Sequence, residues 1–157
     1  MMLEKINLRE CGTCNLCCKL PAINEKDLVK PDYKWCNNCD IGVGCKIYKT
    51  RPAPCKDFLC LWKAHLTDLK PDKVGFFMIV ENKQAMAHKV VTIYCETHLL
   101  DKLPQLIMKD ARSRVWIDEG WAFHIRYNSD DNNIAIFDPK LYGMEVNKQT
   151  RILEEKK

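Results

Sequence analysis

The chain has 157 residues, 46% of them hydrophobic, and a formal net charge of +4. This share of apolar residues is enough for a buried core and excludes wholesale disorder, and the longest apolar run, residues 75–80, is far too short to cross a bilayer. The first eight residues lack the basic start and apolar stretch of a secretory signal. We therefore expect a cytoplasmic protein that makes no membrane contact.

The chain contains ten cysteines, and nine of them lie before residue 61. In a reducing compartment, such dense cysteine use indicates metal binding or redox chemistry rather than disulfides. A disulfide framework would need an oxidising compartment, and no export signal supports one. Metal bound by thiolates is therefore the expected chemistry of this part of the chain.

The positive charge lies in the same part of the chain. Residues 1–66 hold 11 lysines and arginines against 7 aspartates and glutamates, whereas residues 67–157 hold 14 of each. Four thiolates around one divalent zinc leave a site with about two negative charges, which this excess would offset. The alternative is that these lysines and arginines form an ordinary solvated face. The basic residues are scattered and form no block, which argues against a nucleic-acid partner.

Residues 9–60 are rich in Cys, Asn, Gly and Pro and show no sustained periodicity. Turn signals such as Gly42-Val-Gly44 and Arg51-Pro-Ala-Pro54 interrupt this stretch. It cannot gather enough apolar area to fold on packing alone, so metal ligation would have to supply the difference. Between Asp57 and Leu69, apolar residues recur at helical spacing and predict a short amphipathic helix.

Past Pro71 the composition changes to that of a sheet. Residues 74–80 and 85–96 are rich in β-branched and aromatic residues, and residues 81–84 would connect them as a hairpin. A helix is predicted over residues 103–112, because Pro104 falls in its first turn and apolar residues line one side.

The remaining segments predict a second hairpin and a final helix. Residues 121–127 alternate in part, and residues 128–133 are a strong turn signal before the apolar residues 134–137. The tail from about Val146 is predicted as a charged helix. The expected fold class is α+β, with a loop-rich cysteine and metal module over residues 9–62. A small, mostly antiparallel sheet with one or two helices would follow over residues 70–157.

The first cysteine cluster is Cys11-x2-Cys14-x2-Cys17-Cys18. Two residues between cysteines let both sulfurs converge on one ion, because the intervening backbone can curl and donate its N–H groups to the thiolates. Cys17 and Cys18 would point different ways along an extended chain, so they fit two sites better than one.

The second cluster reads Cys36-x2-Cys39-x5-Cys45 and is followed by a Cys-x4-Cys pair. One partition of the ligands joins the pair 11/14 with the pair 36/39, as in a four-cysteine zinc site, and leaves the other cysteines for a second set. Other partitions fit the spacing as well. The candidate metal ligands are Cys11, Cys14, Cys17, Cys18, Cys36, Cys39, Cys45, Cys55 and Cys60.

These motifs make the sequence recognisable. The four-cysteine opening, then Cys36, then Cys45-x2-Tyr48-x2-Arg51-Pro-x2-Cys55-x4-Cys60, resembles the bacterial cysteine-cluster family described as a zinc- or iron-chelating domain (YkgJ-type). Flagellin N-methylases carry a related cluster. The resemblance covers residues 9–62 and implies metal chelation without naming a reaction. Cys39 looks like an addition found in only some members, and no glycine-rich nucleotide loop indicates a methyltransferase.

Residues beside the cysteines have their own predictions. Arg51 would donate to backbone carbonyls or to a thiolate and so support the loop before Cys55, and Tyr48 could do the same with its hydroxyl. His65 could be a ligand, but with nine cysteines at hand a partly buried structural role is favoured. Cys95 is predicted to be a buried apolar thiol.

The sequence leans towards a protein that is not an enzyme, since no nucleophile–base series, phosphate loop or metalloprotease motif is present. Full cysteine ligation favours a metal-binding protein with a mainly structural site, and the balance leans slightly to zinc. The ferredoxin-like interval of the first cluster favours the alternative, an iron–sulfur protein that transfers electrons or assists a protein-modifying enzyme. With a structural metal site, the C-terminal region would offer a surface for a protein partner or a dimer contact, and a protein-interaction adaptor is compatible with either metal.

Overall fold

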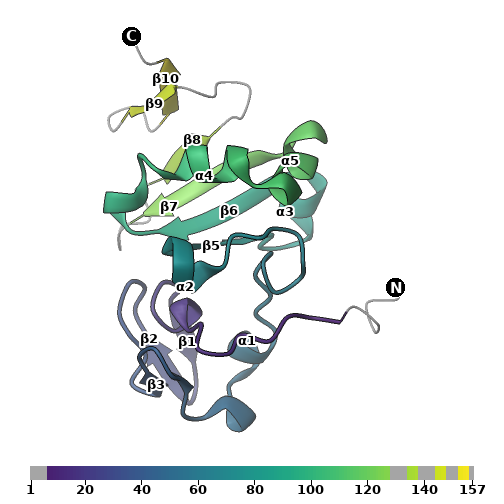
Figure 1. Ribbon diagram of the computed structural model, residues 1–157. Helices are drawn as coiled ribbons and strands as arrows, with labels where there is room; N and C mark the ends of the chain where they lie inside the picture. The colour runs from purple at the N-terminus through teal and green to yellow at the C-terminus, as the bar shows by residue number, and fades with distance from the viewer. Residues whose placement is uncertain (1–6, 128–133, 138–143, 148–151, 156–157) are drawn as a thin grey trace.

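The structure is a computed structural model that describes residues 7–127 and the backbone of residues 134–137, 144–147 and 152–155. Residues 7–70 form the cysteine-bearing part, which lies below the sheet in the view of Figure 1. The sheet and its helices lie above it and carry the larger hydrophobic core. In the described residues, no helix is long and apolar enough to span a membrane.

The cysteine-bearing part is built from short elements, none longer than four residues. Two small antiparallel pairs, β1 with β2 and β3 with β4, follow one helical turn and precede two others. These elements are η1 (Leu16–Cys18), β1 (Ile23–Glu25), β2 (Leu28–Lys30), β3 (Cys39–Asp40), β4 (Gly44–Cys45), η2 (Tyr48–Thr50) and α1 (Ala53–Lys56). Frequent turns interrupt this part, as the Gly, Asn and Pro content predicts.

The amphipathic helix predicted between Asp57 and Leu69 is wrong. The helix α1 ends at Lys56, and the following residues form successive turns, with His65 in the left-handed region at φ +61°. The Leu61 N–H donates to the Met78 carbonyl at 2.8 Å, so this segment bonds to the sheet as well as within its own turns. Its apolar side chains pack into two separate cores and do not line one face of a helix.

The six-stranded sheet has the strand order β5-β6-β7-β8-β10-β9. Neighbouring strands are antiparallel in three pairs and parallel in two, β6 with β7 and β8 with β10. This confirms the α+β class and the mostly antiparallel sheet. The strands are β5 (Phe76–Ile79), β6 (Val90–Cys95), β7 (Ala122–Tyr127), β8 (Ile134–Phe137), β9 (Met144–Asn147) and β10 (Ile152–Glu155).

Both predicted strand pairings are confirmed, with one change in the first. The strands β5 and β6 pair as expected, but their connection contains the helix α3 (Lys83–Ala87), so β6 begins at Val90 rather than at residue 85. Asn82 starts this helix by accepting a hydrogen bond from the Ala85 N–H at 2.8 Å. The strands β7 and β8 also pair, while their predicted turn at residues 128–133 lies outside the described residues.

The parallel step from β6 to β7 passes through η3 (Thr97–Leu99), α4 (Leu103–Lys109) and α5 (Ala111–Asp118). The predicted helix over 103–112 is therefore two helices, because Asp110 ends the first and caps the second by accepting from the Ser113 N–H. A further single turn, α2 (Pro71–Val74), precedes the sheet. The helix predicted from Val146 is wrong, since the tail forms β9 and β10, whose backbones pair with each other and with β8.

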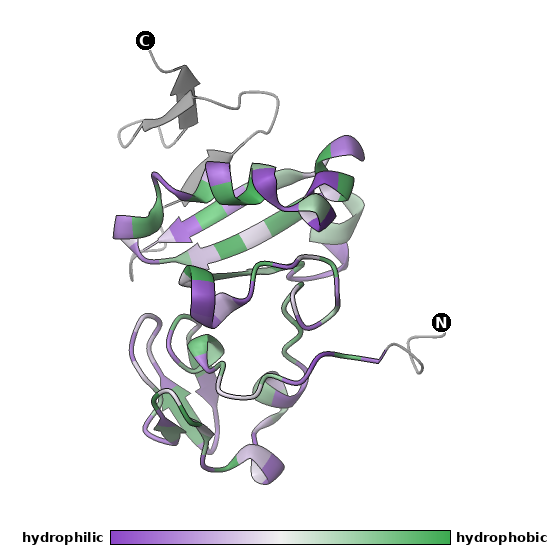
Figure 2. Cartoon of the chain, in the orientation of Figure 1, coloured by the Kyte–Doolittle hydropathy of each residue, from purple (hydrophilic) through white to green (hydrophobic). Residues whose placement is uncertain are grey.

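The main core lies between the sheet and the helices α4 and α5, which cover one face of the sheet (Figure 1). Hydrophobic and polar residues alternate along β7 (Figure 2), and its buried members Phe123 and Ile125 face this core. Cys95 is fully buried there, as predicted, and burial raises the pKa of its thiol to about 12.

A second core joins the cysteine-bearing part to the other face of the sheet. Successive residues of a strand point to opposite faces, so Phe77 turns away from the main core and packs with Leu20 and Cys60. The ring of Phe77 lies 5.1 Å from the rings of both Phe58 and Tyr94. Aromatic contacts thus link β5 and β6 directly to the segments that carry the cysteines.

A buried polar network fastens the chain near Thr67 to the helix α5. The Asp110 carboxylate accepts from the Thr67 hydroxyl at 2.7 Å, from the Ser113 N–H at 2.9 Å and from the Asp68 N–H at 3.2 Å. Burial alone would raise the pKa of Asp110, but these hydrogen bonds and that of the Ser113 hydroxyl outweigh burial and lower it. The network favours the charged carboxylate.

Candidate metal centre

The first cluster, residues 11–18, consists of a turn between Cys11 and Cys14 followed by the 3₁₀ turn η1. The Cys14 N–H donates to the Cys11 carbonyl at 2.9 Å, and Gly12 between them has φ +57°, a conformation that favours glycine. Cys17 and Cys18 lie in η1 rather than in an extended chain, and their thiols are neighbours. The expectation that they point different ways does not hold, because a helical turn replaces the extended backbone on which it rested.

The second cluster forms a turn of the kind that the spacing predicts. The Cys39 N–H donates to the Cys36 carbonyl at 3.0 Å, and the Asn38 N–H donates to the Cys36 sulfur at 3.4 Å. The pairing of β3 with β4 then sets Cys39 opposite Cys45.

Backbone hydrogen bonds hold the two clusters together. The Cys36 N–H donates to the Cys18 carbonyl at 2.9 Å, which brings segments 18 residues apart into contact. Asn15, buried between them, donates from its side-chain amide to the Asp40 carbonyl at 3.1 Å. These contacts bring the cysteines of the first and second clusters to the same part of the molecule.

Arg51 supports the loop that leads to Cys55. Its Nε donates to the Tyr48 carbonyl at 2.8 Å, and its Nη1 donates to the Cys55 carbonyl at 3.4 Å. The guanidinium carbon lies 3.7 Å from the centre of the Tyr48 ring, a cation–π contact. Arg51 was predicted to donate to backbone carbonyls or to a thiolate, and these hydrogen bonds are to carbonyls. Tyr48 acts through its ring and its carbonyl.

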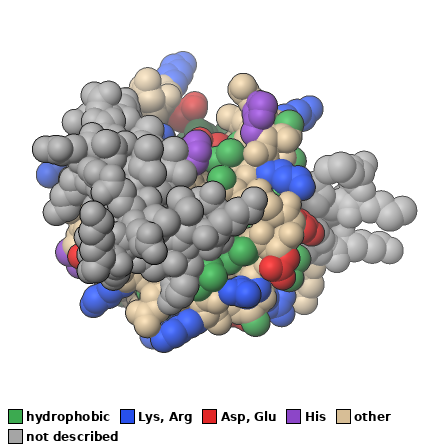
Figure 3. Space-filling view, turned by 90° about the horizontal axis from the view of Figure 1, so that it is seen from above, with side chains coloured by type: hydrophobic (Ala, Val, Ile, Leu, Met, Phe, Trp, Pro, Cys, Tyr) green, Lys and Arg blue, Asp and Glu red, His purple; other side chains and the backbone are tan. Residues whose placement is uncertain are grey.

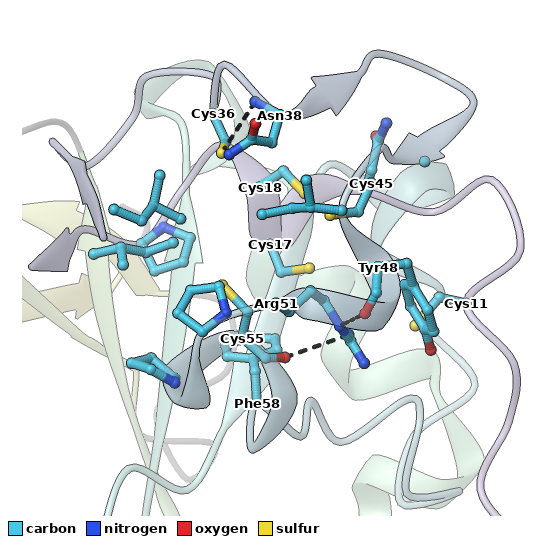
Figure 4. Close-up of a pocket in the computed structure, with 18 of the residues that line it drawn as sticks. Cys11, Cys17, Cys18, Cys36, Asn38, Cys45, Tyr48, Arg51, Cys55 and Phe58 are labelled. Atoms are coloured by element: carbon cyan, nitrogen blue, oxygen red, sulfur yellow. Dashed lines mark hydrogen bonds between the residues drawn. The ribbon is translucent and has the colours of Figure 1, made fainter. Parts of the chain in front are cut away.

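The cysteines line two adjoining cavities. Sulfur-bearing side chains from separate segments surround the larger cavity, of about 160 Å³ (Figure 4). Most of the other lining residues are apolar. The cysteines of this cavity are Cys11, Cys14, Cys17, Cys18, Cys36, Cys45 and Cys55. The smaller cavity, of about 40 Å³, shares four of them and adds Cys60.

The thiols around Cys39 influence one another. Burial, with smaller contributions from the neighbouring Cys18, Cys36 and Cys45, raises the pKa of Cys39 to about 12. Burial also raises the pKa of Cys55, again with a contribution from Cys18, Cys36 and Cys45, while the Arg51 guanidinium opposes the rise. These five cysteines form a first neighbourhood.

A second neighbourhood centres on Cys11. Burial raises the pKa values of Cys14 and Cys60, and Cys11 adds to the rise of both. Cys36 and Cys39 therefore lie near Cys18, Cys45 and Cys55. The partition considered from spacing instead joined them to the pair 11/14. Within the described residues, no three His, Cys, Asp or Glu side chains are arranged as a group that could hold a metal ion. Metal binding would therefore draw the sulfurs closer together.

His65 has the structural role that the sequence favours. Its Nδ1 accepts from the Arg9 Nε at 3.1 Å, so its Nε2 carries the proton and donates to the Asn7 carbonyl at 2.7 Å. Arg9 also pairs with Asp68 at 2.8 Å. Both ring nitrogens are engaged in fixing the segment before Cys11.

Sequence reasoning missed Asn15 and Lys30, two buried polar residues beside the cysteines. Neither belongs to a recognisable spacing, so no sequence signal distinguishes Lys30 from the other lysines of residues 1–66. On the face seen from above, the basic side chains of the described residues are scattered and form no continuous patch (Figure 3). No family model, curated protein or solved structure matches this chain, so the resemblance of residues 9–62 to the cysteine-cluster family stays a sequence-based hypothesis.

Proposed function

We propose that this protein chelates a soft metal through cysteine thiolates, and that the metal mainly serves to hold residues 11–60 in their fold. The observation that carries this proposal is the shared cavity: seven cysteines from separate segments line one space of about 160 Å³. Thiolates are the ligands of zinc and of iron–sulfur clusters. In a reducing compartment such as the cytoplasm, these thiols would stay free to bind metal.

The chemistry of the donor set fits a metal. Burial and crowding disfavour the thiolate forms of Cys39 and Cys55, and a bound cation reverses this preference by supplying positive charge to the same space. The mostly apolar lining would keep competing water out. Because the surrounding elements are no longer than four residues, ligation would also supply folding free energy that packing there does not.

Zinc and an iron–sulfur cluster remain the two candidates, and one observation favours the second. Four sulfurs about 2.3 Å from a single zinc ion leave no large space between them. The cavity of about 160 Å³ is comparable to a cavity of roughly 150 Å³ that admits a benzene molecule. A polynuclear cluster would fill more of this volume and would suit electron transfer or a supporting role in protein modification.

Metal analysis of protein purified without oxygen tests the proposal. We expect stoichiometric metal, with zinc in a colourless protein, or iron and sulfide in a brown protein that bleaches on reduction. Cys36→Ser should lower the metal content, whereas Cys95→Ala, which removes a thiol from the main core, should leave it unchanged. Metal-free protein in which all the cysteines react as free thiols, or are paired as disulfides, would disprove the proposal.

A further inference from the structure

Lys30 is a buried ammonium beside the cysteine clusters. It ends β2 and is only 4% exposed. Its Nζ donates to the carbonyls of Pro31 at 2.8 Å and of Lys19 and Lys34 at 2.9 Å. These bonds use all three of its protons. Within the described residues no carboxylate forms an ion pair with Lys30, so its charge lacks the partner that a buried ammonium normally requires.

The carbonyls that Lys30 binds belong to the segments that carry the thiols. Lys19 directly follows Cys18, and Lys34 lies two residues before Cys36. The Cys36 N–H in turn donates to the Cys18 carbonyl at 2.9 Å. The ammonium therefore lies where the two cysteine segments meet, and it connects both of them to β2.

The thiols are also close enough to interact with this charge. Burial lowers the pKa of Lys30, whereas Cys36, Asp32, Cys18 and Cys55 oppose the shift and favour the ammonium form. Three of these four groups are cysteines of the first neighbourhood. Once a metal binds, their thiolates would be the negative charges available to balance Lys30.

We propose that Lys30 is the fixed counter-cation of an anionic thiolate–metal centre formed by the cysteines around Cys18 and Cys36. This inference rests on the proposed function. Four thiolates with one divalent metal ion carry about two negative charges, and burying them costs free energy unless positive charge lies nearby. Lys30 supplies that charge at a defined place and needs no reorganisation when metal binds, because its hydrogen bonds to carbonyls already hold it there.

Two substitutions separate the charge of Lys30 from its hydrogen bonds. Lys30→Gln keeps donor groups and removes the charge, while Lys30→Arg keeps the charge but presents a planar guanidinium that cannot reproduce all three bonds. The exposed Lys34 is the matched control, because Lys34→Gln removes the same charge from the same loop and leaves the Lys34 carbonyl in place. Each loaded protein would be titrated with a competing chelator, and the fraction of metal retained would be measured.

We expect Lys30→Gln to weaken metal retention roughly ten- to a hundredfold, as the loss of a group supporting a metal site commonly does. Lys30→Arg should retain metal better than Lys30→Gln, and Lys34→Gln should match the original protein. Equal retention in the Gln and Arg variants, or failure of both to fold, would assign Lys30 to hydrogen bonding alone and overturn the inference. If Lys34→Gln and the original protein hold no metal, the proposed function itself fails, which is a separate and recognisable result.

Discussion

Stripping metal from the loaded protein should unfold residues 11–60 and leave the sheet folded but less stable. The cysteine-bearing part has no element longer than four residues, so we expect its order to depend on the proposed ligation and on packing against one face of the sheet. The sheet has its own core with α4 and α5, to which the cysteine-bearing part contributes only Leu61 and Leu69. Different parts of the chain should therefore respond differently to a chelator.

The expected loss of stability in the sheet follows from the second core. Phe77 is 1% exposed and would be uncovered when Leu20 and its neighbours leave, at a cost of about 2–3 kcal/mol. The hydrogen bond from the Tyr33 hydroxyl to the Arg126 carbonyl would add about 1 kcal/mol. Together these terms amount to about 3–4 kcal/mol, or two to three orders of magnitude in an opening equilibrium at about 1.4 kcal/mol per tenfold. A total of about 5–15 kcal/mol, typical of such domains, would leave the sheet folded.

Hydrogen exchange of loaded and stripped protein, both kept reduced, measures this directly. Amides of residues 11–60 should lose protection on stripping, while those of β6 and β7 should lose two to three orders of magnitude of protection and keep the rest. Exchange of β6 and β7 at the rate of an unfolded chain would show that the protein is one metal-dependent domain. Unchanged protection of residues 11–60 would show that these loops fold on packing alone.

Three further predictions concern single side chains. Arg51→Ala should weaken metal retention roughly ten- to a hundredfold, because the carbonyls of Tyr48 and Cys55 lose their donor. Unchanged retention against a competing chelator would show that Arg51 does not support the metal site. Leu20→Ala should lower the free energy of unfolding in urea by about 2–5 kcal/mol, because Leu20 is fully buried, and a loss below about 1 kcal/mol would contradict the second core. Asp110→Asn should cost about 1–3 kcal/mol at pH 7, whereas the exposed Asp118→Asn should cost little. The pKa of Asp110 is lowered by folding, so the stability it adds is present above its ordinary value of 3.8 and is lost as the pH falls through the folded value. The difference between Asp110→Asn and the original protein in urea midpoint should therefore shrink from pH 7 to pH 3, and a constant difference would contradict this role.

Local patterns predicted the elements that depend on local chemistry. The alternation of Phe123 and Ile125 with polar neighbours predicted β7, because one face of that strand is buried and the other is not. Pro104 marked the start of α4, since its missing N–H is not needed there. The spacing of Cys36 and Cys39 predicted a turn with an N–H aimed at sulfur, which depends on only four consecutive residues.

Predictions failed where a distant partner outweighed local preference. The apolar residues between Asp57 and Leu69 have helical spacing, but the bond from Leu61 to Met78 and the network around Asp110 hold that segment against the sheet and α5. The charged tail has the composition of a helix, yet β8 and β9 offer its backbone hydrogen-bond partners. Such partners lie many residues away, so a local pattern contains no sign of them.

The sequence by itself determined which residues are cysteines, how they are spaced, and that β5, β6, β7 and β8 are strands. Only the tertiary structure decided how the cysteines are grouped, because Cys18, Cys36, Cys45 and Cys55 meet through chain crossings that spacing does not encode. It also decided that Lys30, one basic residue among many in the sequence, is the buried one beside the thiols. The physical reason is that spacing governs what nearby residues can do together, whereas burial and charge balance depend on segments that only folding brings into contact.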